Sequence, residues 1–498
     1  MNLAAAFVDS AERHSAKPAM FWGADQFTYD DILRQTRALA SHLQQALRVS
    51  PGDRVGIWLK NCPEFVPVLF AILNAGGVVV PINNFLKPDE VSFIINDAGV
   101  NMLITDKSAA EALPKLSAAR PELRFWLVED FAQLPQSTTD QPSQRGENDL
   151  AVIIYTSGTT GHPKGAMLSH GNLLSNVQSC GEVLSAVEGD RFVVLLPMFH
   201  SFMMTVGVLL PLLVGGSMVL VRSLHPPKNV LLEILQHRAT LLPAIPQFFR
   251  TLANAAVPRD QLPLRLCVSG GAPLPAEILR EFNEKMPIPL IEGYGLSEAS
   301  PVVSLNPVRG PWKAGSIGVP IPGVEVTVQD ETGRKLGRGG TGEICVRGPN
   351  VMQGYWNQPD ETAKAIRDKW LLTGDIGHED SDGYFYITDR KKDMLLVNGI
   401  NVYPREIEEV LYKFPGVREA AVIGVPDARR GEQAMAFVAG NEGATLDEKT
   451  LQQFVRERLA DYKVPKKVVC LTALPRNATG KILKRALREQ AAHMVVSA

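Results

Sequence analysis

The stretch TSGTTGHPKG, residues 156–165, combines three glycines, four hydroxyl side chains, one proline and one lysine. The apolar run LAVIIY before it predicts a short buried strand, and HGNLLSNVQSCGEVLS after it predicts a helix that begins at Ser169 or Asn172. A strand, a glycine-rich loop and a helix suggest a cradle for phosphate, because backbone N–H groups freed by glycine converge on an anion and Lys164 adds a positive charge. For this stretch alone, an ordinary polar connection remains the alternative.

This loop differs from the common phosphate-binding loop. The Walker pattern places Ser or Thr directly after Gly-Lys, so that the hydroxyl reaches Mg²⁺. Here Gly165 follows Lys164, and Pro163 precedes it. The stretch therefore indicates a phosphate site of a different kind.

Composition narrows the class of protein. A chain of 498 residues is too long for one core, so we expect two or more domains. With 45% hydrophobic residues and a net charge of −2, the chain gives no electrostatic reason to bind nucleic acid. The cysteines are scattered without a CxxC pair, which favours a reducing compartment, the cytoplasm, and indicates neither disulfides nor zinc. The amino terminus has no basic lead before its short apolar run, so we expect no signal peptide.

Two uncharged stretches, residues 65–82 and 202–221, reach the length of a membrane span. Each contains a Gly-Gly pair followed by a run rich in β-branched residues. This pattern favours a buried helix that turns into a buried strand, within a sheet covered on both faces. We therefore expect core units of the fold here and no transmembrane segment.

The arrangement of these runs predicts an α/β protein. Between residues 30 and 300, apolar strand-like runs alternate with helical stretches, which indicates doubly wound sheets. After residue 311 the runs become short and broken by Gly and Pro, so residues 311–389 are predicted to form a β-rich, barrel-like module of the N-terminal domain, residues 1–389. A hinge at 390–392 and a smaller, mobile α+β domain at 393–498 complete the prediction.

Three further motifs carry groups suited to a nucleotide. EGYGLSEAS (292–300) sets Tyr294 between two glycines, where it can stack on a flat ring, and offers Glu298 to a Mg²⁺ ion carried by phosphates. SGGAPLP (269–275) is a second glycine turn that could cover the other side of the ring. WLLTGDIGHED (370–380) presents Asp375, whose carboxylate can accept hydrogen bonds from two ribose hydroxyls. Each motif alone could equally be an ordinary turn.

Taken in order, the motifs resemble those of the adenylate-forming superfamily of acyl-CoA synthetases, adenylation domains and luciferases. Four more stretches match it: LPMFHSF (196–202), VRGPNVMQGYWNQPDETAKAI (346–366), DRKKDMLLVNGINVYPREIEEVL (389–411) and LPRNATGKILKRALR (474–488). The likeness covers nearly the whole chain and is greatest to the bacterial fatty-acyl-CoA synthetases.

The resemblance implies a role for each matched position. It assigns catalysis to Lys481, Glu298, Lys164 and Ser297, with Lys481 bridging the carboxylate and the α-phosphate, Ser297 near the α-phosphate and Glu298 on Mg²⁺. Many relatives have Thr at the position of Ser297, and the hydroxyl is kept. The implied ATP- and AMP-binding residues are Thr156, Ser157, Gly158, Thr159, Thr160 and Gly161 for the phosphates, Gly271, Ala272, Pro273, Glu292, Gly293 and Tyr294 for adenine, and Asp375 and Arg390 for ribose. Lys392 stands at the hinge, and Gly399 leaves room for the arm of coenzyme A.

The acyl site is less clearly marked. The residues that fall where relatives line the acyl tunnel are His200, Phe202, Thr205, Gly207, Leu296, Val302 and Val303. An uncharged lining suits an alkyl chain, although apolar residues at such spacing also form ordinary core. The resemblance implies an ATP-dependent ligase of a medium- or long-chain fatty acid and coenzyme A, with Mg²⁺.

Other functions stay open at this stage. The chain could load a carrier protein from an acyl-adenylate, could act on an aryl or hydroxylated acid, or could be a catalytically silent nucleotide-binding relative. The expected partners are small molecules, namely fatty acid, ATP and coenzyme A, with no nucleic acid. Peripheral membrane contact and the oligomeric state are left open.

Overall fold

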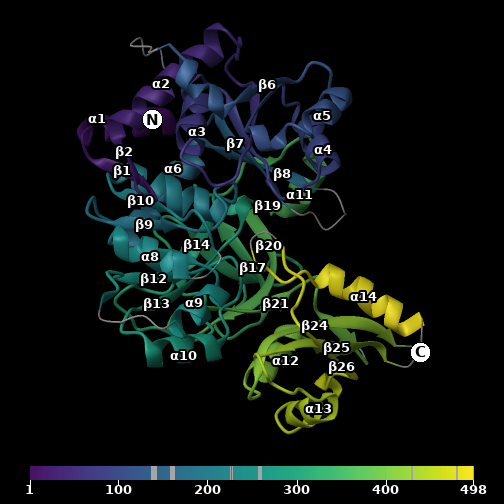
Figure 1. Ribbon diagram of the computed structural model, residues 1–498. Coiled ribbons are helices and arrows are strands. Elements are labelled where there is room, and N and C mark those ends of the chain that lie inside the picture. The colour runs from purple at the N-terminus through teal and green to yellow at the C-terminus, as the bar shows by residue number, and fades with distance from the viewer. Residues whose placement is uncertain are drawn as a thin grey trace.

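The computed structural model describes residues 1–135, 143–156, 163–224, 226, 228–255, 261–398, 400–427, 430–477 and 480–496. Within these residues the strands form four sheets, of nine, seven, five and five strands. The first three make up a large N-terminal domain, and the fourth lies in a smaller C-terminal domain, which Figure 1 shows at the lower right of the molecule. The predicted α/β class with a large and a small domain is confirmed.

The nine-stranded sheet has a parallel centre. In spatial order its strands are β15 (Val319–Pro320), β14 (Val302–Leu305), β13 (Leu290–Gly295), β12 (Leu266–Ser269), β11 (Leu241–Ala244), β9 (Arg191–Val194), β10 (Ser217–Leu220), β1 (Pro18–Trp22) and β2 (Asp25–Thr28). Neighbours from β13 to β1 are parallel, and β14, β15 and β2 pair antiparallel at the edges. The carboxyl ends of the parallel strands share one edge, where sheets of this kind bind ligands.

The seven-stranded sheet is covered on both faces. Its strands in spatial order are β18 (Gly354–Tyr355), β8 (Lys164–Ser169), β7 (Leu150–Thr156), β4 (Val78–Pro81), β3 (Arg54–Trp58), β5 (Met102–Thr105) and β6 (Arg124–Leu127). Val78 and Val80 pack on one face with α4 (Pro88–Ala98) and α5 (Leu113–Ala119), whereas Val79 belongs to the main core on the other face. This alternation is the two-residue period of a strand, and the helices on both faces agree with the predicted doubly wound arrangement.

The main core lies between these two sheets. Among the helices that contribute buried residues to it are α1 (Leu3–Arg13), α2 (Tyr29–Gln45), α3 (Phe65–Asn74), α6 (His170–Val183) and α7 (Leu210–Leu213). Helices α8 (Lys228–Gln236), α9 (Pro246–Ala253) and α10 (Ala276–Lys285) contribute to the same cluster, and the large domain also contains α11 (Pro359–Ala365).

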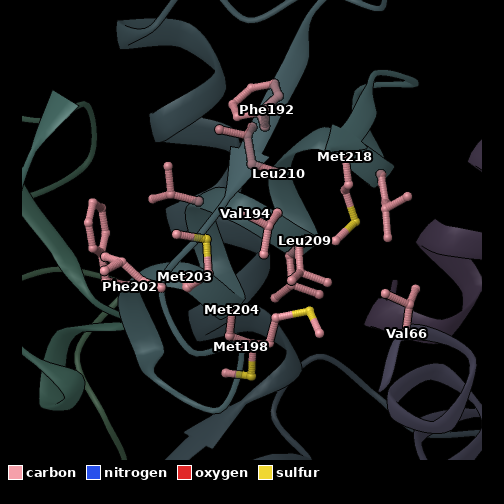
Figure 2. Packing of buried hydrophobic residues seen from close by; sticks show 14 of the residues in the cluster. Val66, Phe192, Val194, Met198, Phe202, Met203, Met204, Leu209, Leu210 and Met218 are labelled. Atoms are coloured by element: carbon pink, nitrogen blue, oxygen red, sulfur yellow. The ribbon is translucent and has the colours of Figure 1, made fainter. Parts of the chain in front are cut away.

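Both uncharged stretches are core units, as predicted. In the first, α3 is followed by β4, and in the second a π-helical segment, η3 (Met203–Leu209), and α7 are followed by β10. The turns between helix and strand contain Gly76 and Gly215, whose φ angles of +83° and +79° lie in the left-handed region that favours glycine. Figure 2 shows the packed side chains of the second stretch, with Val66 reaching the same cluster from α3. In the part of the chain that the structure describes, no helix combines the length and the apolar character of a membrane span.

The two remaining sheets flank the junction between the domains. The β-rich module has strands β16 (Glu325–Gln329), β17 (Gly342–Arg347), β20 (Trp370–Glu379), β19 (Ile366–Arg367) and β21 (Phe385–Arg390). The small domain has strands β23 (Ile400–Val402), β22 (Leu395–Val397), β25 (Gly431–Gly440), β24 (Val417–Asp427) and β26 (Lys467–Leu471). Its helices are α12 (Pro404–Tyr412), α13 (Glu448–Arg456) and α14 (Lys484–Val496). Leu451 of α13 and Leu487 of α14 belong to two separate apolar clusters of this domain.

The segment after the glycine-rich loop differs from the prediction. The sequence suggested a strand, a loop and then a helix, but β8 stands between the loop and α6. It pairs antiparallel with β7, with Thr156 opposite Lys164 and Leu150 opposite Ser169. Helix α6 begins only after Ser169, whose hydroxyl accepts a hydrogen bond from the backbone of Asn172. The N-terminus of α6 is therefore at the far end of β8 from the loop, and Lys164 is held by a hairpin.

Candidate active site

A cavity lies at the carboxyl ends of β12 and β13, beside the segment that follows β9. Its lining residues are Cys180, Val183, Leu184, His200, Ser201, Phe202, Val206, Val268, Ser269, Gly270, Gly271, Gly293, Tyr294, Gly295, Leu296, Ser297, Pro301, Val302, Leu305 and Lys481. The last of these comes from the small domain, so the cavity is closed by both domains.

The residues predicted to hold ribose are close together. Asp375 and Arg390 face each other on the paired strands β20 and β21, with Nε of Arg390 at 3.1 Å from Oδ1 of Asp375. The hydroxyl of Tyr294, on β13, donates a hydrogen bond to Oδ2 of the same carboxylate. The charge of Asp375 raises the pKa of Arg390, and burial raises the pKa of Tyr294. A buried carboxylate thus joins the predicted adenine and ribose sites.

Glu292 connects the two predicted adenine-binding turns. Its Oε1 accepts a hydrogen bond of 2.9 Å from the backbone N–H of Leu274, next to Gly271, Ala272 and Pro273. Its Oε2 is buried and has no hydrogen-bond partner among the described residues. Burial raises the pKa of Glu292 to about 7. Since buried polar atoms are rarely left unpaired, this oxygen can accept one more hydrogen bond.

The groups predicted to meet the phosphates form a connected network. Oε1 of Glu298 accepts hydrogen bonds from the hydroxyls of Thr156, at 3.3 Å, and Tyr355, at 3.0 Å. Nζ of Lys164 forms an ion pair with Glu361 and lies 5.3 Å from the centre of the Tyr355 ring. Sequence reasoning assigned no role to Tyr355 or Glu361, although both belong to the matched stretch 346–366. The predicted residues Ser157, Gly158, Thr159, Thr160, Gly161 and Gly399 lie outside the described residues.

Lys481 and Ser297 both line the cavity. Burial, and then the charge of Arg390, lower the pKa of Lys481 to about 8, while Asp375 and Glu298 act in the opposite direction. Burial, and then the charge of Lys481, lower the pKa of His200 to about 4, so this imidazole is neutral near pH 7. The hydroxyl of Ser297 lies 2.9 Å from that of Ser201, a buried residue that sequence reasoning did not single out.

Only part of the predicted acyl set lines the cavity. His200, Phe202, Leu296 and Val302 line it. The other three are packed elsewhere: Thr205 donates its hydroxyl to the carbonyl of Ser300, an added Cβ on Gly207 would meet Sδ of Met203 at 2.0 Å, and Val303 is buried in the main core.

A further part of the cavity lining was not foreseen. Cys180, Val183 and Leu184, from α6 and its C-cap, line it together with Leu305 of β14. These residues carry no motif, because their approach to the site depends on how α6 packs against β14.

The chain passes from one domain to the other at the predicted hinge. Lys392 is exposed in the turn between β21, in the β-rich module, and β22, in the small domain. Away from this turn, Nη1 of Arg250 in α9 donates a hydrogen bond of 2.9 Å to the carbonyl of Arg418. This hydrogen bond joins the two domains in the orientation in which Lys481 lines the cavity.

Two family models match the chain: AMP-binding enzyme over residues 7–356 and AMP-binding enzyme C-terminal domain over residues 406–481. The chain is 36% identical over 530 residues to the long-chain-fatty-acid–CoA ligase of Bacillus subtilis (strain 168), covering 98% of this chain and 94% of the relative. It is 38% identical over 475 residues to a feruloyl-CoA synthase of an Amycolatopsis species, covering 94% of each.

The fold is also similar to solved structures of MatB from Rhodopseudomonas palustris. The ATP-bound form matches with a TM-score of 0.92 at 34% identity, over 98% of this chain and 99% of that one. The apo form of the same protein matches with a TM-score of 0.80, so the arrangement of this chain is closer to the ATP-bound form. The cavity, the ordered motifs and these matches lead to one conclusion. The chain belongs to the AMP-binding enzyme family and is an AMP-forming acyl-CoA synthetase, which uses ATP and coenzyme A.

Proposed function

We propose that the chain activates a medium- or long-chain fatty acid as its acyl-adenylate and then transfers the acyl group to coenzyme A. The observation that supports a fatty acid is the apolar part of the cavity lining, which includes Val183, Leu184, Val302 and Leu305. Among the described residues that line the cavity, Lys481 is the only Lys, Arg, Asp or Glu. An uncharged pocket accepts an alkyl chain and offers nothing to a second carboxylate.

In the first step, the fatty carboxylate attacks the α-phosphate of ATP and pyrophosphate leaves. Both reactants are anions, so catalysis consists mostly of positioning and charge neutralisation. We assign the neutralising charge at the reacting atoms to Lys481 and the phosphate contacts to Lys164 and Ser297. Asp375 and Arg390 hold ribose. The unpaired Oε2 of Glu292 accepts a hydrogen bond from the amino group of adenine.

Magnesium fits this site as an ion bound to the ATP phosphates. Glu298 offers a carboxylate whose two hydrogen bonds, from Thr156 and Tyr355, both go to Oε1. The described residues contain no cluster of three or more His, Cys, Asp or Glu side chains that could hold a metal ion by themselves. A single carboxylate suits Mg²⁺, which usually keeps several waters and the phosphates of its substrate. The ion would supply positive charge beside the leaving pyrophosphate.

In the second step, the thiol of coenzyme A attacks the carbonyl of the acyl-adenylate and AMP leaves. We propose that the small domain, residues 393–498, rotates about the hinge at 390–392 and withdraws Lys481. The hairpin of β22 and β23 would then approach the cavity with Gly399. Leu396 and Ile400, on either side of this glycine, are 49% and 46% exposed, so the hairpin carries apolar side chains that a second orientation could bury.

A ligase of aryl or hydroxylated acids is the second candidate. The hydroxyl of Ser269 is buried at the cavity and has no hydrogen-bond partner among the described residues. A polar substituent on the acid would satisfy it. The similarity to a feruloyl-CoA synthase also favours this candidate.

The discriminating experiment is AMP formation over a panel of acids from acetate to stearate, with ferulate and a hydroxylated fatty acid included. A fatty acid:CoA ligase gives its highest kcat/KM with an unsubstituted medium- or long-chain acid, and turnover requires coenzyme A. A higher kcat/KM with ferulate would support the second candidate. Turnover with a phosphopantetheinyl carrier protein and none with coenzyme A would indicate an acyl-AMP ligase. We place the reaction in the cytoplasm, where cysteines such as the five free ones of this chain stay reduced.

A further inference from the structure

The ion pair of Lys164 and Glu361 is the starting point. The two residues are 197 positions apart, and β8 and α11 bring them together. The side chain of Lys164 is 10% exposed and that of Glu361 is 24% exposed. An ammonium group with so little access to water needs a counter-charge, and without nucleotide Glu361 supplies it.

Glu361 also has a second partner. Its Oε1 lies 2.6 Å from Nζ of Lys364, one turn along α11, and Lys364 is 73% exposed. The hydrogen bonds from Lys164 and then from Lys364 lower the pKa of Glu361 to about 2, so the carboxylate is ionised at neutral pH. Glu361 therefore keeps a partner when Lys164 moves to another anion.

The pair lies beside the proposed magnesium carboxylate. Tyr355 connects the ion pair to Glu298, because its ring lies under Nζ of Lys164 and its hydroxyl donates a hydrogen bond to Glu298. An anion that binds both to Lys164 and to a metal ion at Glu298 must therefore take the place of the Glu361 carboxylate beside Lys164. In an adenylating enzyme the anions of this kind are the terminal phosphates of ATP and the pyrophosphate product.

We propose that Glu361 is a positioning residue that holds Lys164 between turnovers and competes with pyrophosphate for it, which weakens pyrophosphate binding and favours its release. The inference rests on the proposed role of Lys164 at the terminal phosphates. When ATP binds, Lys164 exchanges Glu361 for phosphate oxygens, and Lys364 keeps the carboxylate paired. After the α–β phosphate bond has broken, Glu361 recaptures Lys164 and pyrophosphate loses a contact.

The test is Glu361→Gln, which keeps the size of the side chain and removes its charge. In the exchange of pyrophosphate into ATP, KM for pyrophosphate should fall about two- to fivefold, the range expected for losing a partly exposed competing ion pair. The kcat of exchange should change far less. Inhibition of acyl-CoA formation by added pyrophosphate should strengthen by the same factor. Asp360→Asn is the matched control, because it removes one negative charge from the same turn at an exposed position and should leave these constants unchanged.

Four outcomes would each overturn a part of this scheme. An unchanged or raised KM for pyrophosphate in Glu361→Gln would reject the competition. An equal fall in Asp360→Asn would show a general field effect and reject it as well. Lys164→Ala tests the assumption that Lys164 binds the terminal phosphates. If this variant binds pyrophosphate as the parent does, the proposed role of Lys164 is wrong, and the proposed competition is wrong with it. If Lys164→Ala weakens pyrophosphate binding and Glu361→Gln has no effect, the competition alone is wrong.

Discussion

The phenolic hydroxyl of Tyr294 donates a hydrogen bond to Oδ2 of Asp375, although 81 positions separate the two residues. The other oxygen of this carboxylate faces Arg390. Asp375 is 3% exposed, so almost all of its interactions are with protein groups. A ribose that binds here meets a carboxylate already oriented by two donors, and its hydroxyls must share the remaining lone pairs.

Substitution of Asp375 should therefore affect ATP more than its deoxy analogue. Asp375→Asn keeps an acceptor oxygen but loses the charge, and hydrogen bonds to charged groups contribute about 1.5 to 3 kcal/mol. We expect kcat/KM for ATP to fall by roughly one to two orders of magnitude. The fall for 2′-deoxy-ATP should be smaller, because one of the two ribose hydroxyls is already missing. Steady-state kinetics with both nucleotides measures the two ratios.

The choice of Asn matters because Asp375→Ala would also leave Tyr294 and Arg390 without their partner. Asp382→Asn, an exposed acid of the same module, is the control for the loss of one charge. If Asp375→Asn kept the full preference for ATP over 2′-deoxy-ATP, Asp375 would not bind ribose.

The part of the cavity lining that comes from α6 provides a test of the acyl site. Cys180→Phe adds bulk where α6 lines the cavity, so the longest acids should lose the most kcat/KM and short acids should be activated as before. Gln178→Phe is a matched control, because Gln178 is exposed on the same helix. The measurement is AMP formation over a series of acids of increasing length. An unchanged chain-length profile in Cys180→Phe would place the acyl chain elsewhere.

Local pattern was sufficient for the fold and for the order of the motifs. The uncharged stretch 65–82 could be identified as helix and strand because Gly76 and Gly77 interrupt it before a run of valines. The motif around Tyr294 and the one around Asp375 could be assigned to one nucleotide through the resemblance to the adenylate-forming superfamily, because each motif alone could equally be an ordinary turn.

Contacts between distant segments could not be predicted from local pattern. Glu361 lies in a matched stretch, but nothing in that stretch indicates Lys164 as its partner, since the contact depends on β18 pairing with β8. Cys180 looks like any buried residue of an amphipathic helix until α6 is placed beside the cavity. Strand β8 could not be recognised from the sequence, because its six residues begin with Lys164 and Gly165, which read as the end of the glycine-rich loop.

The proposed roles of Lys481 predict different effects on the two half-reactions. Lys481→Ala should slow formation of acyl-adenylate from fatty acid and ATP by about 10² to 10³, the loss that follows removal of one preorganised electrostatic contact. The same variant should convert supplied acyl-adenylate and coenzyme A to thioester at nearly the parental rate, because the lysine has left the cavity by then. Single-turnover assays of each half-reaction measure both rates.

The control for Lys481→Ala must remove a positive charge that takes no part in the buried ion pairs of the small domain. Lys484 is unsuitable, because its Nζ lies 2.8 Å from the carboxylate of Glu408. Arg485→Ala removes a side chain that is 81% exposed and should leave both rates unchanged. Equal slowing of the two half-reactions by Lys481→Ala would contradict the two-orientation mechanism.

The lowered pKa of Lys481 predicts an alkaline limb in the first half-reaction only. In this orientation its pKa is about 8, mainly because of burial. Below that pH the side chain is an ammonium group that can neutralise the reacting anions. Above it the side chain is neutral, so kcat/KM for ATP, which reports the free enzyme, should fall by up to about tenfold for each further pH unit.

Thioester formation from supplied acyl-adenylate should lack this limb, because the attacking thiol ionises as pH rises and Lys481 is absent from the cavity. Lys481→Arg keeps a positive charge at every accessible pH, so its alkaline limb should disappear. Its adenylation rate should be lower than that of the parent, because the planar guanidinium group differs in shape from the ammonium group of lysine. The pH profiles of both half-reactions, measured for the parent and for Lys481→Arg, check these points. An identical limb in the parent and in Lys481→Arg would assign the titration to a group other than Lys481.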